Sequence, residues 1–261
     1  MDDRDIKIKT VAALGLDWAA NILFPPACPG CRLRVSRPAT LCGACWPRLR
    51  FLERPWCEAL GTPFDHDPGE GALSPAAIAD PPAFDRARAA VAYGGIARQL
   101  VQELKYGDRT DLAPWMARWM LRPGEELFSP GQLVVPVPLH WRRFISRRFN
   151  QSAELARALA RMKGLAFAPE ALRRVKLTRQ QVGLGRRERT ENVRAAFQVP
   201  DAARAAIAGA PVLLVDDVYT TGATVSSASK ALKRAGAARV DVLTFARVLP
   251  GDFLLGDQDL I

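Results

Sequence analysis

From residue 86 onward, short apolar runs alternate with segments of helical periodicity, which predicts a sheet packed against helices. Four apolar runs are typical of buried strands, at residues 87–93, 133–137, 212–215 and 240–245. Four segments repeat apolar residues at helical spacing, at residues 96–105, 111–121, 150–163 and 225–235. Strands that alternate with helices indicate a parallel sheet covered on both faces, so we predict an α/β fold.

The N-terminal part of the chain has a different pattern. Apolar residues at helical spacing predict an amphipathic helix that ends before a Pro-Pro pair, at Val11, Leu14, Trp18 and Ile22. Residues 58–83 are rich in Gly, Pro and Ala and predict a linker. We therefore expect a small helix and cysteine module over 1–57, a linker over 58–83, the α/β domain over 84–250 and a tail over 251–261. No internal repeat is evident in the sequence.

Composition places the chain among soluble globular proteins. It has 261 residues, of which 49% are hydrophobic and 25% charged. No apolar run reaches the roughly 18 residues of a membrane span. The first residues are acidic and the apolar stretch behind them is interrupted by Asp17 and Asn21, which argues against a secretory signal. We expect a cytoplasmic protein without a membrane span.

The net charge of +10 is concentrated in one segment. Residues 140–194 contain 15 Lys and Arg against four Asp and Glu, so this segment holds the whole basic excess. Such a charge run can be a solvated face, a polyphosphate site or a groove for nucleic acid. The sequence leaves these three interpretations open.

Four cysteines form two C-x2-C pairs, Cys28 with Cys31 and Cys42 with Cys45. Two such knuckles can close a tetrahedral four-thiolate Zn2+ site, and a site without an open ligand position is structural. The alternative is a pair of disulfides, which a reducing cytoplasm disfavours. Cys57 is left over. It could be the remnant of a further knuckle, but Leu60 stands where a partner is needed; we assign no role to it or to His66.

The most informative segment is residues 212–224, where a buried strand is followed by Asp216, Asp217 and a loop rich in threonine. The loop leads into a predicted helix, and such a turn directs N–H groups, hydroxyls and a helix N-terminus at one spot, as in phosphate sites. The two carboxylates would repel a phosphate but suit vicinal hydroxyls or a hydroxyl-bound metal. The combination predicts a sugar 5-phosphate site, against the alternative of a polar turn after a core strand.

This motif resembles the signature of type I phosphoribosyltransferases, which bind phosphoribosyl pyrophosphate with Mg2+. More narrowly, the chain resembles the ComF family of competence-associated proteins, which joins a four-cysteine zinc module to a phosphoribosyltransferase-like domain. The segments that carry this resemblance occur in the family's order: the four cysteines with Trp46, Tyr93-Gly94-Gly95, Leu104-Lys105-Tyr106, Val135-Pro136-Val137-Pro138, Phe149-Asn150-Gln151, Thr178 with Gln181, Arg189 with Asn192-Val193, Phe197, and the Asp-Asp motif.

The resemblance implies a type I phosphoribosyltransferase-like parallel sheet with flanking helices, beside a small N-terminal helix and zinc-knuckle module. It implies that Asp216 and Asp217 hold the ribose hydroxyls and are the catalytic carboxylates. The phosphate loop would consist of Thr220, Thr221, Gly222, Ala223 and Thr224. Arg142 and Arg143 would meet the pyrophosphate, because the planar guanidinium pairs two oxygens at once. Residues 178–194 would close over the ligand.

Two positions depart from the family pattern. Arg148 stands where the pattern has glycine, which changes the backbone that enters the next helix. Thr220 stands where purine-salvage transferases place an aspartate, and a threonine hydroxyl cannot act as a general base near pH 7. Binding of the ligand is therefore better supported than transfer to a purine.

Two functions follow. The first is a phosphoribosyltransferase-family protein that binds phosphoribosyl pyrophosphate and Mg2+, linked to DNA uptake or nucleotide metabolism. The alternative is a non-catalytic module of the DNA-uptake machinery that binds single-stranded DNA or a nucleotide. The basic segment with Trp141, Phe144 and Phe149 suits backbone tracking with base stacking, although aromatic residues more often pack in a core.

Overall fold

The structure is a computed structural model that describes residues 25–37, 40–139, 149–175 and 196–249. The chain divides into two compact units, residues 1–48 and residues 49–261. The helix predicted over 11–22, the tail over 251–261, both arginines of the predicted pyrophosphate loop and the predicted closing segment 178–194 lie outside the described residues. Among the described residues, no helix is both long and apolar enough to cross a bilayer.

The first unit is built from hydrogen-bonded turns around the four cysteines. Its described part contains one 3-10 helix, η1 (Trp46–Arg48), directly after the last cysteine. The buried apolar side chains of this part are Cys28, Pro29, Leu41 and Cys45. So few apolar groups cannot form a core that holds the turns together, and small modules of this kind depend on a metal or another cross-link.

The second unit contains the predicted parallel sheet. Its five strands lie in the order β1-β7-β6-β2-β3, and all neighbouring pairs are parallel. The strands are β1 (Arg86–Ala92), β2 (Leu133–Pro136), β3 (Ala166–Phe167), β6 (Pro211–Tyr219) and β7 (Arg239–Arg247). The predicted α/β fold is confirmed, since four of these strands correspond to the four apolar runs of the sequence.

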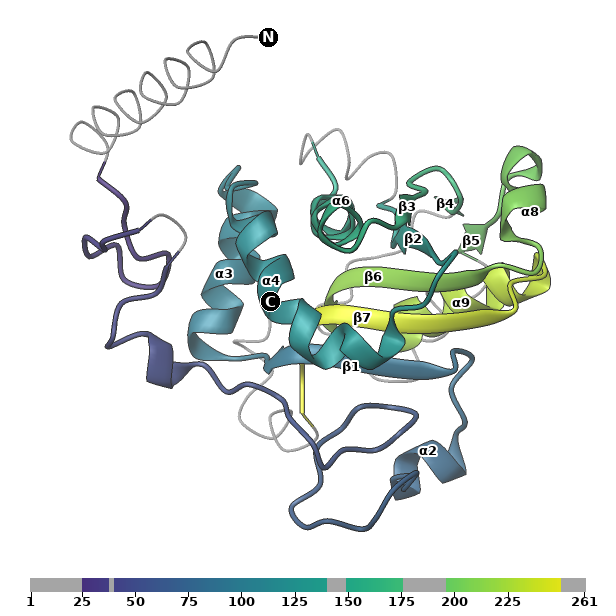
Figure 1. Cartoon of the computed structure of the whole chain (residues 1–261), viewed down its shortest axis with the longest axis horizontal. Helices are drawn as coiled ribbons and strands as arrows, with labels where there is room; N and C mark the ends of the chain where they lie inside the picture. Colours follow the sequence, from purple (N-terminus) through teal and green to yellow (C-terminus); the bar gives the residue numbers. More distant parts are fainter. Residues whose placement is uncertain (1–24, 38–39, 140–148, 176–195, 250–261) are drawn as a thin grey trace, which may run out of the picture. The chain divides into compact units, whose positions relative to one another are not determined.

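Helices cover both faces of this sheet. On one face lie α4 (Leu112–Gly124) and α6 (Gln151–Lys163), with α3 (Gly95–Tyr106) beside α4, and on the other lies α9 (Ala223–Arg234) (Figure 1). On β7, Phe245 stacks against Trp119 of α4, whereas Val240 and Val242 belong to the cluster under α9. Alternate side chains of a strand point to opposite faces, so the central strands direct apolar side chains to both sides of the sheet.

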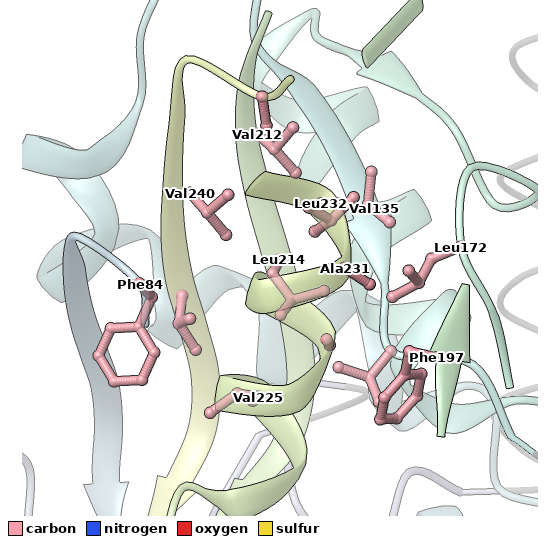
Figure 2. Packing of buried hydrophobic residues seen from close by; sticks show 14 of the residues in the cluster. Phe84, Val135, Leu172, Phe197, Val212, Leu214, Val225, Ala231, Leu232 and Val240 are labelled. Atoms are coloured by element: carbon pink, nitrogen blue, oxygen red, sulfur yellow. The ribbon is translucent and has the colours of Figure 1, made fainter. Parts of the chain in front are cut away.

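A large hydrophobic cluster lies between α9 and the sheet. Val225, Ala231 and Leu232 of α9 pack toward β6 residues Val212 and Leu214 (Figure 2). The cluster also includes Val135 of β2 and Val240 of β7, and side chains from segments around the sheet, namely Phe84, Leu172, Phe197 and Ile207. This packing fixes the start of α9 against the end of β6, which positions the loop between them.

Several short elements were not predicted. They are η1, β3, α2 (Pro75–Ala79), η2 (Glu125–Leu127), α8 (Asp201–Ile207) and an antiparallel pair, β4 (Arg173–Arg174) with β5 (Phe197–Gln198). The most important difference is the length of β6. The predicted strand ends at residue 215, but pairing with β7 continues through Val218 and Tyr219. Asp216 and Asp217 therefore lie within the last part of the strand, whose backbone fixes their side chains.

Candidate functional site

The two acids lie at the topological switch point of the sheet. The chain moves outward from β2 to β3 in one direction and from β6 to β7 in the other, so the order reverses between β2 and β6. Ligands of open α/β sheets bind at the carboxyl ends of the strands at such a point. Asp216 and Asp217 occupy that end of β6, and they are only 9% and 4% exposed.

Asp216 is held by two hydrogen bonds. Its Oδ1 accepts from Ser152 Oγ at 2.7 Å and from the backbone N–H of Asp217 at 2.9 Å. Burial raises the pKa of Asp216 to about 7, and the negative charge of Asp217 adds to the rise, while the two hydrogen bonds oppose it. The carboxyl group therefore sits at the edge of ionisation at neutral pH.

Asp217 forms an ion pair with the end of α3. Lys105 Nζ lies 3.0 Å from Asp217 Oδ2, and only 19% of the lysine side chain is exposed. Burial alone would lower the pKa of Lys105, but the charge of Asp217 outweighs it and raises this pKa. One protonated lysine thus faces two adjacent carboxyl groups.

The start of α6 ties the ends of β2 and β6 together. Asn150 Oδ1 caps α6 by accepting from Ser152 N at 3.1 Å, and its Nδ2 donates to Val137 O at 3.1 Å. Val137 N in turn donates to Val215 O at 2.9 Å. Ser152 is thereby placed next to the acid pair. The two predicted pyrophosphate arginines precede this cap and stay a prediction.

The loop between β6 and α9 has the form expected of a phosphate cradle. Its central residue, Gly222, has a φ of 78° and directly precedes α9. A Cβ there would lie 2.2 Å from Tyr219 Oη, so glycine is required both by the backbone angle and by the close approach of the tyrosine. Thr221 Oγ1 accepts from Ala223 N at 3.5 Å, which folds the loop back onto the helix start.

Tyr219 supports this loop from below. Its ring meets Phe84 edge-on with 6.2 Å between centroids, and the guanidinium of Arg247 lies 4.0 Å from the centre of the same ring. These contacts hold the tyrosine against Gly222. The residues around that glycine are half-buried, namely Thr220, Thr221, Ala223 and Thr224. They can therefore contact a ligand, while Gly222 and Tyr219 beneath them are buried.

The four predicted zinc ligands come together in the first unit. The Sγ atoms of Cys28, Cys31, Cys42 and Cys45 all lie within 4.8 Å of one another. A tetrahedral zinc site with Zn–S bonds of about 2.3 Å needs S–S separations of about 3.8 Å, so the cluster fits Zn2+. Burial would raise the pKa of the Cys28 thiol, but N–H donors that include Cys42 lower it, whereas burial and the neighbouring thiols raise the pKa of Cys45. A bound Zn2+ would deprotonate all four thiols.

Sequence reasoning missed the two partners of the acid pair. Lys105 and Ser152 lie 112 and 64 positions before the carboxylates they contact, and no spacing rule joins positions so far apart. Both lie in or beside segments that carry the family resemblance, 104–106 and 149–151, and that was the one available signal. The supporting role of Tyr219 was also missed, because it depends on a contact with a glycine that has no side chain.

Comparison with known proteins gives two family matches. Residues 19–77 match the double zinc ribbon domain, and residues 161–251 match the phosphoribosyl transferase domain. The first match supports structural zinc at the four-cysteine cluster.

Curated relatives cover most of the chain. It is 30% identical over 228 residues to DNA utilization protein YhgH of Salmonella typhimurium, with 85% of this chain and 84% of that protein covered. The YhgH protein of Escherichia coli K12 is 30% identical over 237 residues, with 87% and 100% covered. Competence protein F of Haemophilus influenzae is 30% identical over 153 residues, with 57% and 66% covered. Among solved structures, the match to TT1426 from Thermus thermophilus covers 57% of this chain and 93% of the TT1426 chain, with 19% sequence identity and a TM-score of 0.34.

Proposed function

Because the chain belongs to the ComF family of competence-associated proteins, and has the family's phosphoribosyltransferase-type domain, we propose that this domain binds phosphoribosyl pyrophosphate with Mg2+ at the carboxyl end of β6. The observation that carries the proposal is the pairing of two buried carboxylates with a glycine-centred loop at the switch point of the sheet. A diol site beside a phosphate site matches a ribose 5-phosphate.

The parts of the site would divide the ligand between them. Asp216 and Asp217 accept hydrogen bonds from the two ribose hydroxyls. The loop 220–224 receives the 5-phosphate on its N–H groups and hydroxyls, where the start of α9 favours negative charge. Arg142 and Arg143 pair with the pyrophosphate, and Mg2+ bound to that group would neutralise part of its charge.

Lys105 and Ser152 prepare the acids for this ligand. The lysine balances one of the two negative charges, and the serine orients the other carboxyl group. When Asp216 is ionised, the two carboxylates and Lys105 together carry one net negative charge, and hydroxyl donors or a cation would stabilise it. The site is therefore complementary to a diol that carries a metal.

Binding is better supported than a particular transfer reaction. If transfer occurs, the bond from the anomeric carbon to pyrophosphate breaks, and catalysis comes from positioning and from stabilising the leaving charge. Thr220 supplies no general base for a purine acceptor. A role in DNA uptake or nucleotide metabolism is proposed from the family alone.

A thermal-shift series tests the proposal. Phosphoribosyl pyrophosphate with Mg2+, at about 100 times its Kd, should stabilise the domain by about 2.7 kcal/mol. For a domain of this size that corresponds to a rise in Tm of about 5–10 °C. Asp217→Asn should abolish the rise, whereas Asp201→Asn, the same change at an exposed position, should keep it.

Two outcomes would overturn the proposal. The first is an unchanged melting curve of the native protein at millimolar phosphoribosyl pyrophosphate and Mg2+. The second is an equal rise in Tm for Asp217→Asn. Parallel samples contain nucleoside monophosphates or single-stranded oligonucleotides. If only these ligands stabilise the protein, it is the alternative, a non-catalytic module that binds nucleotides or DNA. DNA binding should then weaken steeply with salt.

A further inference from the structure

The hairpin that carries Cys28 has a distinctive set of backbone hydrogen bonds. Val35 N donates to Pro26 O at 2.9 Å, Cys28 N donates to Leu33 O at 2.7 Å, and Arg32 N donates to Cys28 O at 2.7 Å. Arg32 has a φ of 62°, an uncommon value for a residue other than glycine. Together these features describe the first knuckle of the zinc site.

The same set recurs 29 residues later, around Cys57. Phe64 N donates to Pro55 O at 2.9 Å, Cys57 N donates to Thr62 O at 2.8 Å, and Gly61 N donates to Cys57 O at 2.7 Å. Gly61 has a φ of 66°, at the position that corresponds to Arg32. Donor, acceptor and left-handed residue all match, so the second hairpin is a copy of the first.

The thiols of the two hairpins are also approached in the same way. Cys28 Sγ accepts from the backbone N–H of Cys42 at 3.3 Å. Cys57 Sγ accepts from the backbone N–H of Ser74 at 3.2 Å. Ser74 therefore holds the position in the second copy that Cys42, a zinc ligand, holds in the first.

The turns that follow these two donors match as well. Cys45 N donates to Cys42 O at 3.1 Å, and Ala77 N donates to Ser74 O at 2.9 Å. Ala77 thus corresponds to the fourth ligand, Cys45. The double zinc ribbon match ends at residue 77, the last position of this second copy.

We propose that residues 55–77 form a second ribbon that folds without metal, in which Cys57 is the one ligand retained. By position, the other ligands correspond to Leu60, Ser74 and Ala77. Leucine and alanine offer no ligand atom, and Ser74 Oγ already accepts from Ala77 N at 3.3 Å. A single buried thiol cannot hold Zn2+, which needs four ligands in a structural site.

Packing on the sheet replaces the metal in this second ribbon. Leu60 packs against the hydrophobic cluster under α9. Ala59 O accepts from Ala87 N of β1 at 2.8 Å. Arg88, whose side chain is fully buried, donates to the backbone oxygen and to the carboxylate of Glu58, each at 2.8 Å. The leucine at a ligand position thus contributes apolar burial where a cysteine would contribute a bond to zinc.

This arrangement confines the dependence on metal to the first unit. The second ribbon lies within residues 49–261 together with the sheet, whereas the four-cysteine cluster lies within residues 1–48. Removing zinc should therefore unfold the first ribbon and leave the sheet and its ligand site intact.

Zinc content tests the inference on the full-length protein. The native chain should hold about one zinc ion, Cys57→Ala should hold the same, and Cys28→Ala/Cys31→Ala should hold almost none. A variant with Leu60→Cys, Ser74→Cys and Ala77→Cys should hold about two. Two zinc ions in the native chain, or a loss of zinc in Cys57→Ala, would overturn the inference, as would one ion in a folded triple variant.

A second measurement covers the case in which the triple variant does not fold. Co2+ substituted into the native protein should show the charge-transfer and ligand-field bands of one four-thiolate site, and these bands should be unchanged in Cys57→Ala. Chelation of the metal should leave the Tm of the sheet domain within about 2 °C. A bleached spectrum in Cys57→Ala, or loss of the sheet's melting transition on chelation, would show that the second ribbon uses metal.

Discussion

Asp216→Asn should make the protein more stable at alkaline pH while it abolishes the ligand-induced rise in Tm. The folded protein keeps this carboxyl group buried beside a second carboxylate, and burial raises the pKa of Asp216 to about 7. An asparagine can still accept from Ser152 Oγ and from the N–H of residue 217, and it carries no charge. The substitution therefore removes a cost of folding and leaves the hydrogen bonds in place.

The sign and the size follow from proton linkage. The unfolded carboxyl group ionises near pH 3.9, whereas the folded one stays protonated until about pH 7. Stability is therefore lost as pH rises from about 4 to about 7 and stays lost above that. Each tenfold change in proton affinity corresponds to about 1.4 kcal/mol, so the full cost at pH 8.5 is about 4 kcal/mol.

Thermal or urea unfolding of the native protein and of Asp216→Asn at pH 5.0 and pH 8.5 measures this effect. We expect a gain of about 1–4 kcal/mol at pH 8.5, equivalent to about 2–4 °C per kcal/mol. The gain at pH 5.0 should be about one third as large, because only the part of the cost that accrues between about pH 3.9 and pH 5.0 is then present. Asp201→Asn is the matched control at an exposed side chain that pairs with Arg204; it should cost less than about 1 kcal/mol, by a similar amount at both pH values.

The reasoning would be refuted by a variant that is less stable than the native protein at pH 8.5. It would also be refuted by a gain of the same size at both pH values, since a gain without pH dependence cannot come from ionisation of the buried carboxyl group.

Three other effects should accompany this one. Lys105→Met leaves Asp217 as a buried charge without its partner and should lower the free energy of unfolding at pH 7.5 by about 3–5 kcal/mol, measured by urea titration, whereas Lys105→Arg should lower it less. Gly222→Ala should reduce stability and remove the ligand-induced rise in Tm, because its Cβ would meet a tyrosine hydroxyl; Gly209→Ala has a similar positive φ but open space around it, and should cost about 1 kcal/mol with the rise intact. Affinity for phosphoribosyl pyrophosphate, measured by calorimetry and corrected for the ligand's own phosphate ionisation, should fall by up to about tenfold per pH unit below pH 7, because the ionised carboxylate of Asp216 is the stronger acceptor for two hydroxyl donors. A flat profile between pH 6 and 8 would contradict this.

Most of the sheet could be predicted from the sequence because its strands are buried on both faces. Such strands are continuous apolar runs, and the helices between them show a clear apolar stripe. The short elements could not be predicted because they lack such a run or stripe. Two-residue strands such as β3 and β5 have no periodicity, and α8, with four alanines in seven residues, has almost no contrast between its faces.

The sequence indicated the candidate acids and the loop, but not what surrounds them. Lys105 reaches Asp217 only because α3 packs where it does, and that packing is a tertiary property. The second ribbon was hidden for a related reason. Its likeness to the first lies in backbone hydrogen bonds and one left-handed residue, while the ligand side chains that would mark it in a sequence have been replaced.

The two carboxylates are costly to the fold, which is itself an argument that they serve a ligand. A structural role would be met at lower cost by one carboxylate paired with Lys105, yet the chain buries a second one whose hydrogen bonds do not offset its burial. Strain and unfavourable charge of this kind concentrate at functional sites. The second ribbon gives the opposite case, since Leu60 and Ala77 are apolar at two of the three positions where a cysteine ligand is missing. Positions that bind no ligand in the second ribbon carry packed apolar side chains, whereas the switch point of the sheet keeps two buried carboxylates.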